Sequence, residues 1–313
     1  MEQIMKTTFA ALLLGMTVFP SLAASLPTLY DYRLTTPQGE ALGIDQITQK
    51  LHDADVILVG EWHGHAGVHL FQAKLFSSLA GTYPGVSLSM EQFSRDRQEL
   101  INEYLKGKIG EQALISKGNA WNNYPSDYRP LVEIAKAAKL DVIAANAPKS
   151  VVRCIGQQGL AYLEKLTPKE RGFVAKHVDT TESAYKTRFM ASMHHGSKDQ
   201  SEKQFAAQVT WDETMAESIV RQARKEPGGK VFHIAGRFHV SEGLGIAARI
   251  HRLDPSLNIV MITPETKDSP LPATSPDYRL EVLPPPEQYI SHDEMRGAIK
   301  AMRPHSGKYT CHK

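Results

Sequence analysis

Short apolar runs recur along the 313-residue chain, with helical spacing between them. The clearest is Val56-Ile57-Leu58-Val59, which is bounded by Asp55 and Gly60. Similar runs occupy residues 86–90, 141–145, 231–235 and 259–262, and helical spacing covers 44–51, 66–80, 96–106 and 128–138. Continuous apolar runs of this length are typical of strands buried on both faces. Because strands that alternate with helices form parallel sheets, the sequence predicts an α/β fold with a mainly parallel sheet flanked by helices.

The alternation is interrupted between residues 151 and 225, where the pattern is helical and contains no convincing strand. We interpret this stretch as a smaller helical cap domain inserted above the sheet. The α/β core then comprises residues 24–150 and 226–290, with 291–313 as a C-terminal tail. Within a proline-rich segment, residues 278–283 are a candidate edge strand.

Residues 1–23 have the features of a secretory signal peptide. Lys6 precedes an apolar run over residues 9–19, and the small residues Ala23 and Ala24 follow as cleavage points. This run is too short to span a bilayer comfortably, although an uncleaved N-terminal anchor is the alternative. The sequence therefore predicts export to the periplasm. Neither cysteine lies at the cleavage point, so lipid attachment there is not supported.

The two cysteines, Cys154 and Cys311, form neither a zinc site between themselves nor a Cys-x-x-Cys-His motif for covalent haem attachment. An oxidising compartment favours a disulfide between them, which would tie the C-terminal tail to the body of the protein. Two free, buried thiols are the alternative.

Charge and motif content exclude several functions. The formal net charge is +2, from 36 basic and 34 acidic residues, so the sequence gives no support for a nucleic-acid-binding protein. No phosphate-binding glycine motif follows a strand, and no Gly-x-Ser-x-Gly elbow is present.

Polar residues gather where the predicted strands end. Glu61 and His63 follow the first strand, Glu91 follows the second, and His239 follows the strand over 231–235. Ligands of open α/β sheets bind at the carboxyl ends of the strands, so we expect these four side chains to form one site. Glutamate and histidine supply acid–base or metal-ligand chemistry, and His63, Glu91 and His239 are the candidate metal ligands. The alternative is a buried, purely structural hydrogen-bond network.

A second set of residues carries groups that ligate haem iron. His194 and His195 lie in the helical insertion, and Tyr124 and Tyr128 follow Trp121. The alternatives are a solvated loop for the two histidines and packing at a cleft edge for the two tyrosines.

Seven separated motifs occur in order over roughly residues 52–262. They are Gly60-Glu61-Trp62-His63, Met90-Glu91-Gln92-Phe93 with Asp96 and Gln98, Tyr104-Leu105-Lys106-Gly107, Tyr128-Arg129-Pro130-Leu131, Ala145-Asn146-Ala147-Pro148, Ala207-Gln208 with Trp211-Asp212-Glu213-Thr214-Met215-Ala216, and Gly236-Arg237-Phe238-His239-Val240. Together they resemble the motifs of the ChaN-like haem-binding uptake proteins.

The resemblance implies an exported haem-binding protein of bacterial iron uptake, with non-covalent haem and a tyrosine as iron ligand. It also implies a homodimer around two stacked haems, and a haem-uptake receptor or transporter component as a delivery partner. The candidate tyrosines are Tyr124, Tyr128 and Tyr185, and Arg129 or Arg237 would pair with a haem propionate. The family's typical member is a lipoprotein, whereas this signal segment lacks a lipobox cysteine.

The chain is also similar to the erythromycin esterase-like and Tiki-like hydrolases. Glu61, His63, Glu91 and His239 match their paired Gly-x-x-His motifs and glutamate. The rival hypothesis is therefore an esterase-like or amidase-like hydrolase that uses these residues as general base or metal ligands. The sequence favours a periplasmic haem-binding protein over an enzyme.

Overall fold

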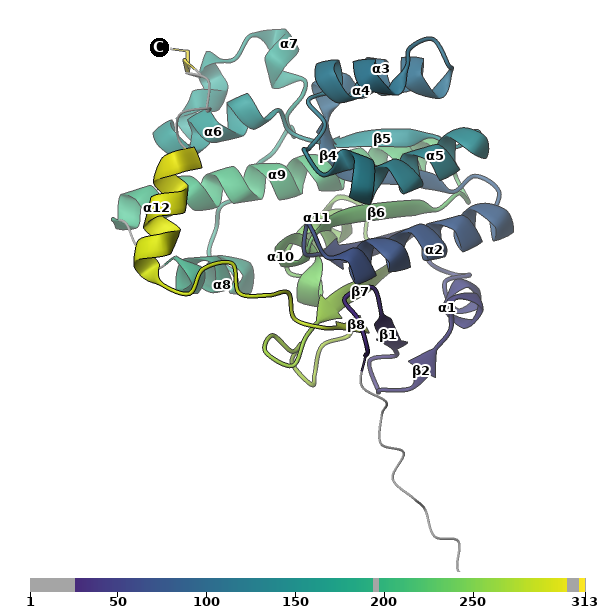
Figure 1. Cartoon of the computed structure of the whole chain (residues 1–313). Coiled ribbons are helices and arrows are strands. Elements are labelled where there is room, and N and C mark those ends of the chain that lie inside the picture. Colours follow the sequence, from purple (N-terminus) through teal and green to yellow (C-terminus); the bar gives the residue numbers. More distant parts are fainter. Residues whose placement is uncertain (1–25, 194–196, 303–309, 313) are drawn as a thin grey trace, which may run out of the picture.

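The computed structural model contains a central eight-stranded sheet (Figure 1). It describes residues 26–193, 197–302 and 310–312. The predicted signal peptide, His194 and His195 lie outside the described residues. The strand order is β2-β1-β8-β7-β3-β6-β4-β5. The strands are β1 (Tyr32–Thr35), β2 (Ala41–Leu42), β3 (Val56–Glu61), β4 (Ser87–Ser94), β5 (Val142–Asn146), β6 (Val231–Gly236), β7 (Ile259–Glu265) and β8 (Tyr278–Val282).

Neighbouring strands from β8 to β5 pair in parallel, and only β1 and β2 are antiparallel additions. The predicted mainly parallel sheet is therefore confirmed. The prediction of an edge strand at 278–283 is wrong, because β8 lies between β7 and β1. The strand β1, which lies between β2 and β8, was not predicted from the sequence because Leu34 is its single buried residue and its pattern therefore does not alternate.

Helices cover both faces of the sheet. The helices are α1 (Ile44–Lys50), α2 (Ala66–Thr82), α3 (Gln98–Leu105), α4 (Glu111–Gly118), α5 (Arg129–Ala137), α6 (Lys149–Gln158), α7 (Pro168–Arg171), α8 (Ala184–Ser192), α9 (Lys198–Lys225), α10 (Arg237–Val240), α11 (Ile246–Leu253) and α12 (His292–Met302). Short 3-10 or π turns lie at Arg95–Arg97, Tyr124–Tyr128, Leu160–Lys165 and Ser241–Gly243.

Alternating residues of β3 build the two halves of the core. Ile57 and Val59 pack with residues of α1, α2 and α5, whereas Val56 and Leu58 pack with residues of α9 and α11. All four are fully buried. Full burial of one such side chain contributes about 1.5–3 kcal/mol. The carboxyl ends of β3, β4 and β6 are thus held rigidly where the polar residues follow.

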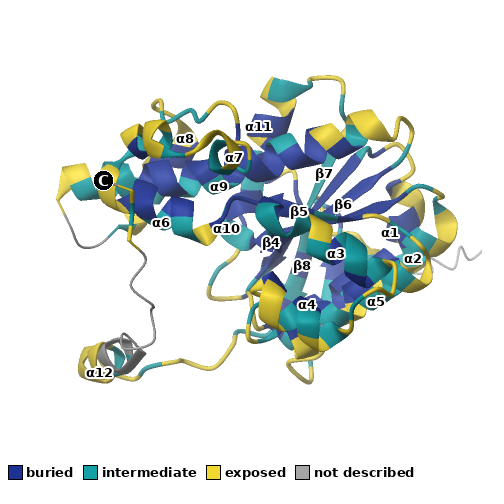
Figure 2. Cartoon of the chain, turned by 90° about the horizontal axis from the view of Figure 1, so that it is seen from above, coloured by how far each residue is buried: buried dark blue, intermediate teal, exposed yellow. Residues whose placement is uncertain are grey.

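The helix α9 joins the α/β core to the helices that precede it (Figure 2). It begins at the cap Ser197, whose side chain accepts a hydrogen bond from the Gln200 backbone at 3.2 Å. Phe205 in its first half packs with α8, and Ile219 in its second half packs on the sheet. The segment interpreted as a cap therefore shares its longest helix with the core. Among the described residues, no helix is long and apolar enough to cross a membrane.

The predicted disulfide is present. Cys154 on α6 is bonded to Cys311, which lies 157 residues away in sequence. A crosslink that closes so long a loop stabilises the folded state by up to about 5 kcal/mol in the chain-entropy description. The bond attaches the end of the chain to the helices that precede α9.

Candidate functional site

The carboxylate of Glu61 is the buried centre of a hydrogen-bond network at the end of β3. It accepts hydrogen bonds from Gln72 Nε2 at 2.8 Å, Gln92 Nε2 at 3.0 Å and the Tyr128 hydroxyl at 2.7 Å. His63 Nδ1 donates a fourth at 2.8 Å. Burial by itself raises the pKa of Glu61, but the hydrogen bond from His63 and the other donors outweigh it and the pKa is lowered. Glu61 is therefore an ionised anchor for His63.

The imidazole of His63 is only partly buried. Its side chain is 46% exposed, and its ring packs edge-on against Trp121 with centroids 4.8 Å apart. Asn123 Nδ2 donates to the His63 carbonyl oxygen at 2.6 Å and so fixes the turn that carries the ring. Burial acts to lower the pKa of His63, but the hydrogen bond to Glu61 and the charge of Glu91 raise it overall. Because Nδ1 is held by Glu61, Nε2 is the ring atom left to meet a ligand.

The second histidine, His239, is buried next to Gly236, close to His63. Its Nδ1 lies 2.6 Å from Asp212 Oδ1, and its Nε2 lies 3.8 Å from Glu91 Oε1. The Tyr185 hydroxyl donates to the other Asp212 oxygen at 2.7 Å. Burial acts to lower the pKa of His239, but the carboxylates of Asp212 and Glu91 raise it to about 9. His239 is therefore an imidazolium at neutral pH, held between two carboxylates.

Gly236, at the end of β6, allows the two histidines to converge. A Cβ atom built at this position would lie 3.1 Å from His63 Nε2 and 3.5 Å from His239 Cδ2. The backbone N–H of Gly236 donates to Glu91 Oε2 at 2.7 Å. A larger residue would push the His63 ring away, so glycine is needed here for close approach. The structure thus brings together Glu61, His63, Glu91 and His239.

A cavity of about 590 Å³ opens above these residues, and we call it the strand-end cleft. Arg237 Nε donates to the Pro264 carbonyl at 2.8 Å, and its guanidinium lies 5.5 Å from the centroid of the Trp62 ring. Arg188 Nη2 donates to Glu242 at 2.5 Å. The cleft is lined by Glu61, Trp62, His63, Arg188, Gln208, Gly236, Arg237, Phe238, His239, Ser241, Glu242, Pro270 and Pro272. It combines one accessible imidazole with two guanidinium groups and aromatic surface.

The candidate tyrosine ligands are all buried. The Tyr128 hydroxyl donates to Glu61, and the Tyr185 hydroxyl donates to Asp212. The buried Tyr124 hydroxyl has no hydrogen-bond partner within the described part of the chain. Burial, followed by neighbouring acidic groups, raises the pKa of Tyr128 and Tyr185, and burial also raises the pKa of Tyr124. The described conformation offers none of the three phenolates to a ligand in the cleft.

The remaining candidates lie elsewhere. Arg129 pairs with Glu111 and does not line the strand-end cleft. In residues 26–193, 197–302 and 310–312, no three His, Cys, Asp or Glu side chains are grouped so as to hold a metal ion.

Residues of α9 and α8 complete the site and were not identified from the sequence as members of it. Asp212 lies in one of the quoted motifs, and Gln208, one helical turn earlier, shares its face of α9. Arg188 reaches the cleft from α8. The available signal for Asp212 was an acidic residue at helical spacing from the apolar Val209, Met215 and Ala216.

Comparisons with known proteins agree with this architecture. Residues 47–250 match the family described as "Haem-binding uptake, Tiki superfamily, ChaN". A solved structure titled "Cofacial heme binding to ChaN of Campylobacter jejuni" superposes with a TM-score of 0.64 at 20% identity, over 80% of this chain and 96% of that chain. At this identity the likeness shows a shared fold.

A curated relative, the chloroplastic protein RETICULATA-RELATED 5 of Arabidopsis thaliana, is 26% identical over a 193-residue alignment that covers 58% of this chain. The match spans only 26% of that relative's length. An erythromycin esterase mutant in its open conformation also matches, with a TM-score of 0.45 at 13% identity over 87% of each chain.

Proposed function

Since the chain belongs to the ChaN family of haem-binding uptake proteins in the Tiki superfamily, we propose that it binds haem non-covalently and takes part in haem or iron uptake. We place it in the periplasm on the strength of the predicted signal peptide. The Cys154–Cys311 disulfide is consistent with an oxidising compartment. A homodimer around stacked haems and a receptor or transporter component as delivery partner belong to the same proposal.

The geometry of His63 carries the haem proposal. Imidazoles that ligate metals usually donate their second ring N–H to a carboxylate or carbonyl, which fixes the tautomer and raises the basicity of the ligating nitrogen. Glu61 supplies that carboxylate at 2.8 Å, and the half-exposed ring lines the strand-end cleft. We therefore propose His63 as the protein ligand to haem iron.

The cleft lining fits the rest of the haem molecule. Trp62 and Phe238 offer apolar surface to a porphyrin, and Arg188 and Arg237 are the cations available to its propionates. A tyrosine ligand would require Tyr128 or Tyr185 to leave its carboxylate partner. His63 reaches the cleft without such a rearrangement.

Titration of the mature protein, residues 24–313, with haemin tests this proposal. We expect saturable binding with a Soret shift characteristic of histidine coordination, and competition by free imidazole. Serum albumin and a heat-denatured sample of the same protein serve as references for specific and non-specific uptake. Binding no tighter than to the denatured sample would contradict the proposal.

Hydrolysis is the second candidate function, and the protonation state of His239 favours it. A buried imidazolium is suited to donate a proton to a leaving group or to stabilise a developing oxyanion. His63, across Gly236, is placed to accept a proton from water. The two histidines therefore have the complementary roles that a general acid and a general base require.

A panel of esters and amides tests the hydrolase function. We expect turnover that is saturable in substrate, retained in the surface variant Lys117→Gln and lost in His239→Gln. The folded state of each variant is checked by circular dichroism, because His239 is buried. Turnover that survives in His239→Gln would assign the hydrolysis to another site or to a contaminant.

A further inference from the structure

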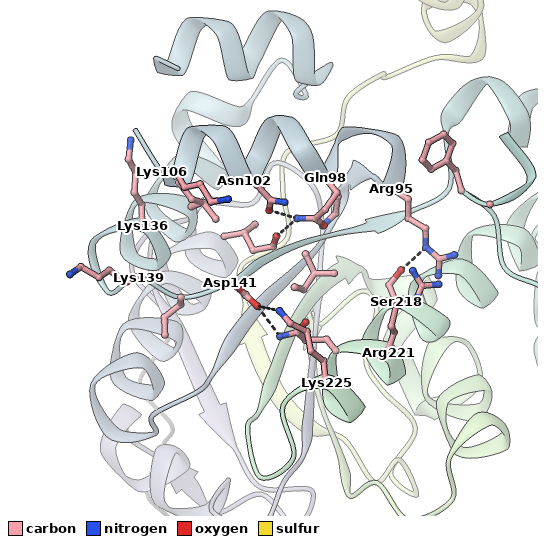
Figure 3. A pocket seen from close by; sticks show the side chains of 18 residues that line it. Arg95, Gln98, Asn102, Lys106, Lys136, Lys139, Asp141, Ser218, Arg221 and Lys225 are labelled. Atoms are coloured by element: carbon pink, nitrogen blue, oxygen red, sulfur yellow. Dashed lines mark hydrogen bonds and ion pairs between the residues drawn. The ribbon is translucent and has the colours of Figure 1, made fainter. Parts of the chain in front are cut away.

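A second cavity, of about 830 Å³, lies beside β5, and we call it the strand-edge groove (Figure 3). It is separate from the strand-end cleft, since the two share no lining residue. The groove runs along β5 between α3 and α5 on one side and α9 on the other. Its charged lining residues are Arg95, Lys106, Lys136, Lys139, Arg221, Lys225 and Asp141.

The cations form two groups at opposite sides of the groove, as Figure 3 shows. Lys106, Lys136 and Lys139 form the lysine group. Within the described residues, the side chains of Lys106 and Lys139 have no hydrogen-bond or ion-pair partner, and Lys136 Nζ lies 3.8 Å from the centroid of the Tyr104 ring. In the part of the chain that the structure describes, no acidic side chain pairs with this group, so it adds positive charge at this side of the groove.

Arg95 and Arg221 form the arginine group. Both bond to the single carboxylate of Glu217, at 3.0 and 2.8 Å. Arg95 is buried, and burial together with the charge of Arg221 lowers its pKa to about 10, so it remains charged at neutral pH. Two guanidinium groups share one carboxylate, which leaves a net positive charge at this side as well.

Between the two groups, Lys225 and Asp141 neutralise one another at 2.7 Å. Gln222 Nε2 also donates to Asp141 Oδ2 at 3.3 Å. The apolar part of the lining consists of the partly exposed Leu105, Leu140, Ile143 and Phe173 and the buried Val142 and Ala144. Asp141 to Ala144 spans three residue steps along an extended chain, or about 10 Å. The groove is thus a partly apolar trough with a cationic group at each end.

The open edge of β5 is already occupied, which limits what the groove can accept. Gln98 Nε2 donates to the Val142 carbonyl at 2.8 Å, and Gln98 Oε1 accepts from the Ala144 N–H at 2.8 Å. One side-chain amide therefore takes the place of a neighbouring strand and blocks the addition of a peptide strand. A ligand in the groove is recognised by the side chains instead.

From this arrangement we infer that the strand-edge groove is a binding site for an elongated organic dianion, with two acidic groups separated by an apolar chain. One acidic group meets the lysine group and the other meets the arginine group. The apolar chain covers the trough. The site is independent of the haem proposal, because none of these residues lines the strand-end cleft.

Calorimetric titration with dodecanedioate and with dodecanoate tests this inference. The two probes have the same chain length and differ in the second carboxylate. We expect dodecanedioate to bind about tenfold more tightly at low ionic strength, and salt to reduce the difference. Equal affinities would mean that the groove selects an apolar chain with one acid, and absence of binding would mean a solvated basic surface. Either result overturns the inference.

Variants locate the binding. Lys106→Gln with Lys139→Gln removes charge at one end, and Arg221→Gln removes it at the other. We expect either change to bring the affinity for dodecanedioate close to that for dodecanoate. The matched control, Lys117→Gln with Lys267→Gln, changes two exposed lysines outside the groove and should leave the affinity within about twofold of the parent. An equal loss in this control would show that net charge, and not the groove, determines binding.

Discussion

Replacement of His63 by alanine is expected to weaken haemin binding by about 100-fold or more and to abolish the histidine-type Soret band. A 100-fold loss corresponds to about 2.7 kcal/mol. The change removes the imidazole that we propose as the iron ligand, but it leaves the aromatic and cationic lining of the cleft in place. Haemin titration followed by absorbance is the measurement.

The controls separate ligation from general damage. His52 is an exposed histidine remote from the cleft, and His52→Ala should bind haemin like the parent. Glu61→Gln should weaken binding by about 10–100-fold, because loss of a carboxylate partner typically has that effect on a ligating histidine. An unchanged spectrum in His63→Ala, together with its loss in Tyr185→Phe, would assign the iron to a tyrosine.

The affinity should also depend on pH in a direction that the site determines. A proton competes with iron for His63 Nε2, so haem binding releases a proton from the charged ring. Because the pKa of His63 is raised, this competition extends toward neutral pH. Weaker binding in acid is therefore expected in the parent protein and not in His63→Ala.

The sequence predicted the parts of the fold that depend on local physics. The run at Val56–Val59 was predicted as a strand buried on both faces, and β3 contains it but continues through Gly60 to Glu61. Convergence of Glu61, His63, Glu91 and His239 then followed from parallel strand direction alone. Neither prediction depends on how the helices pack against the sheet.

The remaining parts of the site depend on tertiary packing. Asp212 reaches His239 only because α9 packs on the face of the sheet and extends past the carboxyl ends of the strands (Figure 1). Burial of Tyr124 and Tyr128 depends on the π-helical turn between α4 and α5, which has no periodic pattern in the sequence. Aromatic residues near a predicted cleft are equally compatible with an exposed ligand and a buried donor, and packing decides between them.

The charge of His239 makes the stability of the folded protein depend on pH. Its pKa is raised from 6.5 to about 9 by Asp212 and Glu91, against the opposing effect of burial. The folded state therefore binds this proton more tightly than the unfolded state does. The resulting stabilisation is complete below pH 6.5 and is lost as the pH rises through about 9. At about 1.4 kcal/mol per pKa unit, the loss is about 3 kcal/mol.

Urea unfolding at a series of pH values between 6 and 10 measures this loss. Other groups titrate in the same range, so the informative quantity is the difference between the parent and His239→Gln. That difference should shrink by about 3 kcal/mol as the pH rises, because the variant carries no titrating group at this position. The exposed-site variant His52→Gln should follow the parent at every pH. A constant difference between the parent and His239→Gln would show that His239 is neutral in the folded protein, and would remove the imidazolium on which the hydrolase candidate depends.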